Sequence, residues 1–471
     1  PHRIFLRTRA LFLLVWDKET EESETHPDGY GNVFENFRIP HWIDYIRTSS
    51  DGSPVIVVQN KVDQRDDRFT GYEKLLKEQY EPIFDFQYVS AKNDHRDGMG
   101  KLTKCIRDAY ETKVPGIGQL IGVQWMDVKN KLKELQHRRS IEYDEYLKIC
   151  ADTGLEGTEH ETLINLLHDS GFLYFLKHTK PQKVILDQRW AIDAAYAVLN
   201  RGSTCYNEFC RKNKHGFTIA DIGRLVWDGH YKPEEQEELL KFMVDAKVCF
   251  EFARGVYIAP QLLDPERPNT SHLNRWKHPS DPAIKFSYKF LHNAIIEGFI
   301  VCAGRMVRDE DPIIWRNGIA IYDETCNTDA LVEADPKKKE ICVLTNGEQP
   351  LILIKKIIDE LSFLHSDYEP EMLLSVDGGR RFVSKKNLEE AYQIEAKKVK
   401  DENGKVLTLG DFIPFLQKLK KEDTEYKQKN GLPEQKLKEI RMEPEKPTLK
   451  CFVSYAHAHA DCCDVFITDL I

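Results

Sequence analysis

The sequence predicts a multidomain protein that combines α/β and α+β folds, and three observations support this prediction. The chain has 471 residues, roughly three times the size of an ordinary domain. In its first part, continuous apolar runs alternate with helical patterns, as expected for a parallel sheet covered on both faces. Further on, helices alternate with short strands and Gly turns, and then strand patterns predominate. We therefore expect several domains of different fold class in succession.

Composition limits the classes of protein to consider. Hydrophobic residues make up 41% and charged residues 31% of the chain, as in a soluble globular protein. No apolar run approaches the roughly 18 to 20 residues of a membrane helix, and the N-terminus lacks a signal-peptide pattern, so we expect a cytoplasmic protein without an integral membrane segment. Eleven irregularly spaced cysteines favour reduced thiols over disulfides. The formal net charge of −10 argues against nucleic acid as a partner.

Residues 1–114 have the alternation of a partial doubly wound domain. Apolar runs at Ala10 to Trp16, Val55 to Val58 and Phe86 to Val89 predict strands. Helical patterns lie near 72–80 and 100–110, and a polar, Gly-containing insertion lies near 18–33. We expect a parallel sheet that corresponds to the second half of such a domain.

Four further regions follow. Residues 117–264 show the order helix, helix, short strand, Gly turn and strand twice, which is typical of tandem winged helices. Residues 284–390 predict an α+β domain with an antiparallel sheet. Residues 391–448 are rich in Lys and Glu and predict a helical linker with flexible joints. Residues 449–471 predict a new strand and the start of a helix.

A short polar motif follows the strand at Val55: Asn60, Lys61, Val62 and Asp63. A carboxylate offers two acceptor oxygens in one plane, which suits the N1 hydrogen and 2-amino group of guanine, so Asp63 could recognise that base. Asn60 could tie the loop to neighbouring backbone, and the aliphatic stem of Lys61 could lie along the base. The alternative is an ordinary polar turn after a buried strand.

A second motif favours guanine recognition. Ser90, Ala91 and Lys92 follow the next strand, after one intervening helical pattern. Loops that leave the carboxyl ends of neighbouring parallel strands lie at one edge of the sheet, where ligands bind. The backbone N–H of Ala91 could then donate to guanine O6.

Together, Asn-Lys-x-Asp and Ser-Ala-Lys resemble the fourth and fifth guanine-nucleotide motifs of Ras-like GTPases. The resemblance implies a P-loop GTPase sheet that binds GTP or GDP with Mg²⁺. It also requires a Gly-rich phosphate loop, which the sequence lacks, and an Asp-x-x-Gly motif ahead of the strand at Ala10 to Trp16, where none is present. The opening "PHRIFLRTRALFLLVWD" is similar to the segment just after the second switch. We therefore expect a truncated GTPase domain that retains the base pocket but lacks the phosphate loop, the switches and the Mg²⁺ ligands.

The stretch "VILDQRWAIDAAYAVLNR", residues 184–201, resembles the COR domain of Roco proteins, in which COR follows a Ras-like Roc domain. "HRIFLRTRALFLLVWD" and "SPVIVVQNKVD" are similar to bacterial Roc domains. The resemblance implies Roc at 1–114, a winged-helix COR-A part at 117–264 and a COR-B part at 284–390. It also implies homodimerisation through COR, coupled to GTP binding and hydrolysis.

The end of the chain, "LKCFVSYAHAHAD" from Leu449, resembles the first strand and loop of TIR domains, which have a flavodoxin-like fold. Such domains associate with one another, and some cleave NAD with a Glu that would lie beyond Ile471. No catalytic residue can therefore be assigned in this chain.

The preferred hypothesis is a GTP-hydrolysing molecular switch that controls a TIR signalling effector. One alternative is a COR dimerisation and interaction scaffold with a non-hydrolysing G domain, and another is an NAD-cleaving TIR effector regulated by Roc-COR. Zinc at Cys205, Cys210 and His215 is disfavoured by the ligand spacing. The second helix of each winged-helix unit is acidic, which disfavours DNA binding.

Overall fold

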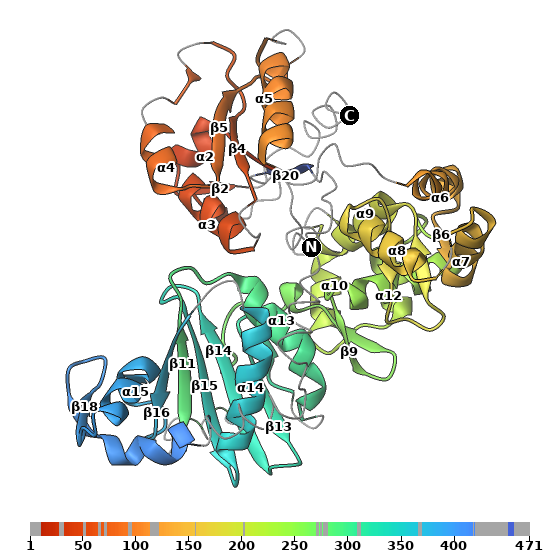
Figure 1. The fold of residues 1–471 in the computed structure, drawn as a ribbon. Coiled ribbons are helices and arrows are strands. Elements are labelled where there is room, and N and C mark those ends of the chain that lie inside the picture. Colours follow the sequence, from red (N-terminus) through yellow and green to blue (C-terminus); the bar gives the residue numbers. More distant parts are fainter. Residues whose placement is uncertain are drawn as a thin grey trace. The chain divides into compact units, whose positions relative to one another are not determined.

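The structure is a computed structural model of the chain (Figure 1). The described residues are 11–27, 33–49, 53–64, 67–69, 73–92, 97–113, 122–155, 157–200, 203–269, 273, 276, 281–308, 312–365, 370–417, 419 and 451–455. They form two compact units: the first holds the described residues up to 196 together with 200, 203 and 451–455, and the second holds residues 197–199 and the described residues from 204 to 419.

The N-terminal region contains the expected parallel sheet, in the strand order β20-β1-β4-β5. Its strands are β1 (Leu11–Trp16), β4 (Val55–Gln59), β5 (Ile83–Tyr88) and β20 (Cys451–Tyr455). All residues of β1 and β4 are buried, which explains why these strands are continuous apolar runs. The register pairs Trp16 with Gln59 and Gln59 with Tyr88, so β1, β4 and β5 end level with one another.

Helices cover both faces of this sheet (Figure 1). They are α3 (Ile39–Ser49), α4 (Glu73–Gln79) and α5 (Asp97–Lys113). Leu102, Cys105 and Ala109 of α5 share a core with Leu13 and Val15 of β1. The polar insertion after β1 is structured: it forms α2 (Lys18–Glu22) and a hairpin of β2 (Thr25–Pro27) and β3 (Val33–Glu35).

The next region contains, twice, the order of two helices followed by two short strands that the sequence predicts. The first consists of α6 (Val123–Glu134), the 3-10 turn η2 (Leu135–Arg138), β6 (Ser140–Glu142), α7 (Tyr143–Asp152), α8 (Glu159–Asp169), β7 (Tyr174–Leu176) and β8 (Lys183–Ile185), followed by α9 (Gln188–Leu199). Its antiparallel sheet has the order β6-β8-β7. Tyr146, Ile164 and Val184 lie in the core between helices and sheet.

The second repeat has the same order. It consists of α10 (Tyr206–Asn213), α11 (Ile219–Leu225), α12 (Pro233–Asp245), β9 (Phe250–Ala253), β10 (Val256–Ile258) and η3 (Pro260–Leu262). A single bridge between Phe217 and Tyr257 takes the place of the first short strand. The buried amide of Asn213 accepts from the N–H of Ala259 at 2.7 Å and donates to its carbonyl at 3.0 Å, which anchors the chain after β10.

The antiparallel α+β domain is also present, as a seven-stranded sheet in the order β12-β13-β14-β15-β11-β16-β17. Its strands are β11 (Ala283–Ser287), β12 (Ile314–Trp315), β13 (Gly318–Asp323), β14 (Thr328–Asp335), β15 (Glu340–Gly347), β16 (Glu371–Ser375) and β17 (Val383–Ser384). The helices α13 (Asn293–Ala303) and α14 (Pro350–Leu364) and the turn η5 (Gly304–Met306) pack against it. Phe286, Phe299 and Ile357 lie in the main core.

This domain continues beyond residue 390, where the sequence predicts a linker to begin. After α15 (Lys385–Gln393), the chain forms a hairpin of β18 (Lys398–Lys400) and β19 (Val406–Thr408), and then η6 (Leu409–Phe412). Phe412, Phe415 and Leu416 are buried in the same core as Phe286. The composition here is charged, but Phe412, Phe415 and Leu416 are buried, so a count of Lys and Glu did not reveal the contribution of this segment to the core.

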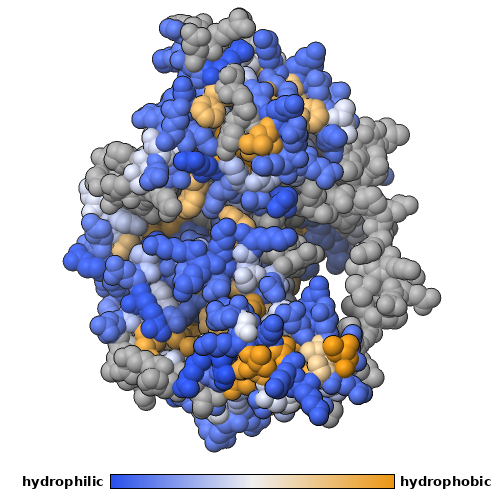
Figure 2. Space-filling view, turned by 90° about the vertical axis from the view of Figure 1, so that its left-hand side faces the viewer, coloured by the Kyte–Doolittle hydropathy of each residue, from blue (hydrophilic) through white to orange (hydrophobic). Residues whose placement is uncertain are grey.

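The strand predicted near residue 451 is present as β20. It was expected to begin a separate domain, but here it pairs in parallel with β1 of the N-terminal sheet, with Leu11 opposite Cys451 and Val15 opposite Tyr455. The helix predicted after it lies outside the described residues. Among the helices that the structure describes, none has both the length and the apolar character of a membrane span. On the face drawn in Figure 2, hydrophilic side chains predominate and apolar ones form small groups.

Candidate functional site

The two polar motifs meet at one edge of the parallel sheet. Asn60, Lys61 and Asp63 follow β4, and Ser90 and Lys92 follow β5. Backbone pairing continues past the strands: the N–H of Val62 donates to the carbonyl of Val89 at 3.0 Å, and the N–H of Val89 donates to the carbonyl of Gln59 at 2.9 Å. Parallel strands that end level therefore bring the two motifs side by side.

The carboxylate of Asp63 is bound by both motifs. The hydroxyl of Ser90 donates to Asp63 Oδ1 at 2.5 Å, and Lys92 Nζ forms an ion pair with Asp63 Oδ2. Ser90 is buried, whereas the side chain of Lys92 is 73% exposed. The hydrogen bond and the charge of Asp63 raise the pKa of Lys92 above its ordinary value. The carboxylate is thus held from a buried side by a hydroxyl and from the solvent side by an ammonium group.

Two residues that belong to neither motif, Gln59 and Asp67, hold the Asp63 loop in place by hydrogen bonds. Asp67 Oδ2 accepts from the N–H groups of Asp63 at 3.0 Å and Gln64 at 2.8 Å. The buried amide of Gln59 donates to the carbonyl of Asp67 at 2.8 Å and accepts from the N–H of Phe69 at 2.9 Å. In the sequence, Gln59 could have been recognised as a candidate because it is a polar residue at the end of an otherwise apolar strand.

Asn60 makes the kind of backbone contact that the motif predicts. Its Oδ1 accepts from the N–H of Ala91 at 3.2 Å, and its own N–H donates to the carbonyl of Trp16 at 2.8 Å. The Ala91 N–H that was expected to face guanine O6 therefore donates to Asn60 in this structure. Since Asn60 is buried, the contact fixes the two loops relative to each other.

Lys61 reaches across to the end of β1. Its backbone is left-handed, with φ of 59°, which is uncommon for a residue other than Gly. Lys61 Nζ lies 2.8 Å from Asp17 Oδ2, and Asp17 Oδ1 accepts from the N–H of Thr20 at 2.9 Å as the N-cap of α2. Burial alone would raise the pKa of Asp17, but the hydrogen bonds from Lys61 and Thr20 outweigh it and lower that pKa below its usual value.

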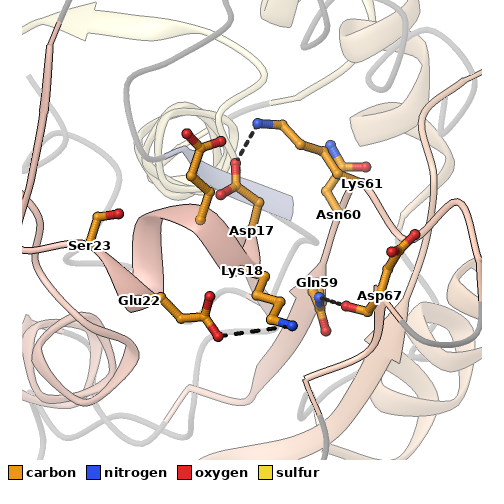
Figure 3. A pocket seen from close by; sticks show the side chains of 9 residues that line it. Asp17, Lys18, Glu22, Ser23, Gln59, Asn60, Lys61 and Asp67 are labelled. Atoms are coloured by element: carbon orange, nitrogen blue, oxygen red, sulfur yellow. Dashed lines mark hydrogen bonds and ion pairs between the residues drawn. The ribbon is translucent and has the colours of Figure 1, made fainter.

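A pocket of about 370 Å³ adjoins these loops (Figure 3). Its lining comes from α2, the end of β4 and the loop after it, and includes Asp17, Lys18, Glu22, Asn60, Lys61 and Asp67. Asp63, Ser90 and Lys92 are not among the lining residues, so the pocket lies beside the Asp63 carboxylate rather than around it.

Other candidates from the sequence do not form a site in the described part of the chain. No three His, Cys, Asp or Glu side chains converge there as metal ligands, and this holds for Cys205, Cys210 and His215. His168 Nδ1 accepts from the backbone N–H of Phe175 at 3.0 Å. Burial raises the pKa of Cys105 to about 11 and that of Cys342 to about 12, which disfavours thiolates.

Comparisons with known protein families match most of the region after the parallel sheet. Residues 122–263 match the model described as "C-terminal of Roc, COR-A domain". Residues 282–423 match the model described as "C-terminal of Roc, COR-B domain". The second match extends past residue 390, in agreement with the buried Phe412 and Phe415.

Two curated relatives and a solved structure are similar to this chain. A "Roc-COR-CHAT protease" from an unknown prokaryotic organism is 23% identical over 413 residues, which are 83% of this chain and 36% of that protein. The "Probable serine/threonine-protein kinase pats1" of Dictyostelium discoideum is 23% identical over 388 residues, which are 78% of this chain and 12% of that protein. This chain thus spans about a third and about an eighth of their lengths.

The solved structure is that of Methanosarcina barkeri Roco2 RocCORdC bound to GDP, with 23% identity and a TM-score of 0.41, covering 56% of this chain and 75% of that one. The family assignment comes from the two matched domains in direct succession, COR-A and then COR-B, and from the relatives that align over most of the chain. The chain therefore belongs to the Roco-type, Roc-COR family.

Proposed function

We propose that this chain is the guanine-recognising and COR-containing part of a GTP-binding, GTP-hydrolysing molecular switch. One observation carries the proposal: the Asp63 carboxylate, bound by Ser90 from the neighbouring strand's loop, lies at the carboxyl edge of a parallel sheet. Ligands of doubly wound folds bind at this edge. Residues 1–114 would be the C-terminal part of a Roc domain.

The donors around Asp63 define how guanine would bind. Ser90 occupies one lone pair of Oδ1, and Lys92 occupies Oδ2. Because Lys92 is largely exposed and surface ion pairs contribute little, the base could displace its ammonium group and donate its N1–H and 2-amino hydrogens to the carboxylate. Adenine has an acceptor at N1, so the buried polar groups of the site would lose their partners and reject it.

The other base contacts follow from Asn60, Lys61 and Ala91. The Ala91 N–H, now 3.2 Å from Asn60 Oδ1, is the donor that we assign to guanine O6. A hydrogen bond of that length can be shared with a second acceptor. The aliphatic stem of Lys61 would lie along the face of the base, while its ammonium group stays on Asp17.

The phosphates and Mg²⁺ would be bound by residues outside this chain. The sequence has no Gly-rich phosphate loop, and no cluster among the described residues offers three metal ligands. Mg²⁺ would supply charge neutralisation on the β- and γ-phosphates when bound. The chain as printed should therefore bind guanine nucleotides weakly.

The proposal also covers dimerisation and output. COR-A and COR-B would mediate a homodimer whose state depends on the nucleotide, and residues from Leu449 would begin a TIR effector that can associate with other TIR domains. The names of the two relatives support a connection between Roc-COR and an effector, since one is called a protease and the other a kinase. The linker would pass the conformational state to the effector.

The test compares nucleotide binding by residues 1–471 with binding by the full-length protein that contains them, using fluorescent GDP and competition by GTP, ATP and XTP. We expect weak binding by residues 1–471, and Mg²⁺-dependent binding with guanine preference by the longer protein. Tight, Mg²⁺-dependent GTP binding by residues 1–471 alone would contradict the proposal that the residues that bind the phosphates and Mg²⁺ lie outside this chain. A longer protein that dimerises but binds no guanine nucleotide would favour the scaffold alternative.

A further inference from the structure

We propose that Asp17 is a positioning residue for guanine recognition, because it anchors the Lys61 side chain across the end of the sheet. The inference rests on the proposed function and extends the site to a residue that neither guanine motif contains. It starts from the ion pair between Lys61 Nζ and Asp17 Oδ2, at 2.8 Å, which joins the loop after β4 to the loop after β1 (Figure 3).

Asp17 is a fixed anchor. Its side chain is 13% exposed, and its Oδ1 is bound by the N–H of Thr20 at the start of α2. The hydroxyl of Thr20 donates to the backbone carbonyl of Asp17 at 2.9 Å, which fixes the same turn a second time. One carboxylate oxygen thus serves the helix cap, and the other is free to hold Lys61.

Lys61 needs such an anchor. Its side chain is 47% exposed and carries several rotatable bonds, so an untethered Lys61 would have to be ordered when the base binds. Its left-handed backbone, with φ of 59°, directs the residue away from the path of a regular strand. The contact with Asp17 holds the stem in an extended conformation before ligand binding.

The neighbouring charges support this assignment rather than a general surface ion pair. Lys18 pairs with Glu22 at 3.9 Å within α2, and Lys92 pairs with Asp63. Asp67 binds backbone N–H groups of the Asp63 loop. Lys61 is therefore paired with Asp17, and Lys92 is paired with Asp63. The two lysines near the proposed base site are thus bound by different carboxylates.

The alternative role of Asp17 is that of a helix cap only, and Asp17→Asn separates the two roles. Asn caps helices about as well as Asp, because its side-chain oxygen accepts the same hydrogen bond, but it carries no charge for Lys61. Asp85→Asn is the matched control, since Asp85 forms an ion pair of 2.7 Å with Lys77 in the same domain and lies outside the proposed site.

The experiment measures GDP affinity in the full-length protein for Asp17→Asn, Asp85→Asn, Lys61→Met and the double variant Asp17→Asn/Lys61→Met, with thermal unfolding of each. We expect Asp17→Asn to weaken GDP binding roughly fivefold to tenfold, the effect of freeing one long side chain. Asp85→Asn should bind GDP like the wild type. In the Lys61→Met background, Asp17→Asn should have no further effect.

An equal loss from Asp17→Asn with and without Lys61 would overturn the inference, since Asp17 would then act through the helix alone. Unchanged GDP affinity in Asp17→Asn would overturn it as well. Asp63→Asn, measured in parallel, distinguishes failure of the positioning role of Asp17 from failure of the proposed guanine site. If it abolishes the guanine preference while Asp17→Asn has no effect, only the positioning role fails; if the preference survives Asp63→Asn, the proposed guanine site itself fails.

Discussion

The hydroxyl of Ser90 donates a hydrogen bond of 2.5 Å to Oδ1 of Asp63, a residue 27 positions earlier in the chain. The bond links the loops after two neighbouring parallel strands. Because Ser90 is buried and donates to Oδ1, the orientation of the Asp63 carboxylate is restricted before any base arrives. A preorganised carboxylate of this kind is what recognition of two adjacent N–H donors requires.

The first prediction concerns base selectivity. Asp63→Asn replaces one acceptor oxygen by an NH₂ donor, which suits the 2-keto group of xanthine instead of the 2-amino group of guanine. In the full-length protein we expect the preference to shift from GDP toward XDP. Competition of both nucleotides against fluorescent GDP and XDP measures the shift. Unchanged guanine selectivity would remove Asp63 from the pocket.

The second prediction concerns the hydrogen bond from Ser90 to Asp63. Ser90→Ala removes the donor to Oδ1, so the carboxylate gains rotational freedom, and we expect GDP affinity to fall roughly fivefold, equivalent to about 1 kcal/mol. Thr112→Ala is the control, because Thr112 lies on the exposed side of α5 and its hydroxyl bonds only within that helix. Equal GDP affinities of Ser90→Ala and Thr112→Ala would show that GDP binding does not depend on the hydrogen bond from Ser90 to Asp63.

The third prediction concerns competition between Lys92 and the base. Lys92→Met removes the ammonium group from Asp63 Oδ2 and keeps a long apolar side chain, so GDP should bind about two- to fivefold more tightly. Lys74→Met, which removes an exposed lysine paired with Glu78 on α4, should leave the affinity unchanged. A severalfold loss in Lys92→Met would mean that Lys92 contacts the base instead of competing with it.

The fourth prediction tests the extent of the COR-B core. Phe412 is 1% exposed and packs in the same core as the seven-stranded sheet, so Phe412→Ala should lower the free energy of unfolding by about 3 to 5 kcal/mol. Val406→Ala, at a position that is 56% exposed on β19, should change it by less than about 0.5 kcal/mol. Urea denaturation of both variants makes the comparison. Similar changes in the free energy of unfolding for the two variants would mean that the residues after 390 do not contribute to the core.

The fifth prediction is a pH dependence in COR-B. Burial lowers the pKa of His365 to about 4, and its Nδ1 lies 2.9 Å from the hydroxyl of Tyr288. Below the ordinary histidine pKa of about 6.5, the unfolded chain binds a proton that the folded domain does not, so stability should fall as pH drops from 7 to 5, by at most about 1.4 kcal/mol per pH unit. His365→Gln should flatten this slope, and His230→Gln, at an exposed position, should not. Identical slopes in the wild type and His365→Gln would contradict the assignment.

Local patterns in the sequence were sufficient for the elements that depend on neighbours in the chain. The buried parallel strand β1 is apolar throughout and β4 is apolar up to Gln59, and the helix–strand order of COR-A occurs twice, so both could be predicted. The spacing of the two polar motifs relative to their strands placed Asp63 and Ser90 at the same edge, because parallel strands direct their carboxyl ends to one side.

The tertiary structure alone decided contacts between residues that no local pattern relates. Asp17 and Lys61 belong to loops after different strands, and only the level ends of β1 and β4 bring their charges to 2.8 Å. Phe412 and Phe415 lie in a charged segment, and only their place in the core that they share with strands of the antiparallel sheet shows that they are buried. The sequence by itself determined the strands and the polar residues of the loops that follow them. Long-range packing determined which side chains hold those residues in place, because such contacts depend on how elements far apart in the chain are aligned in space.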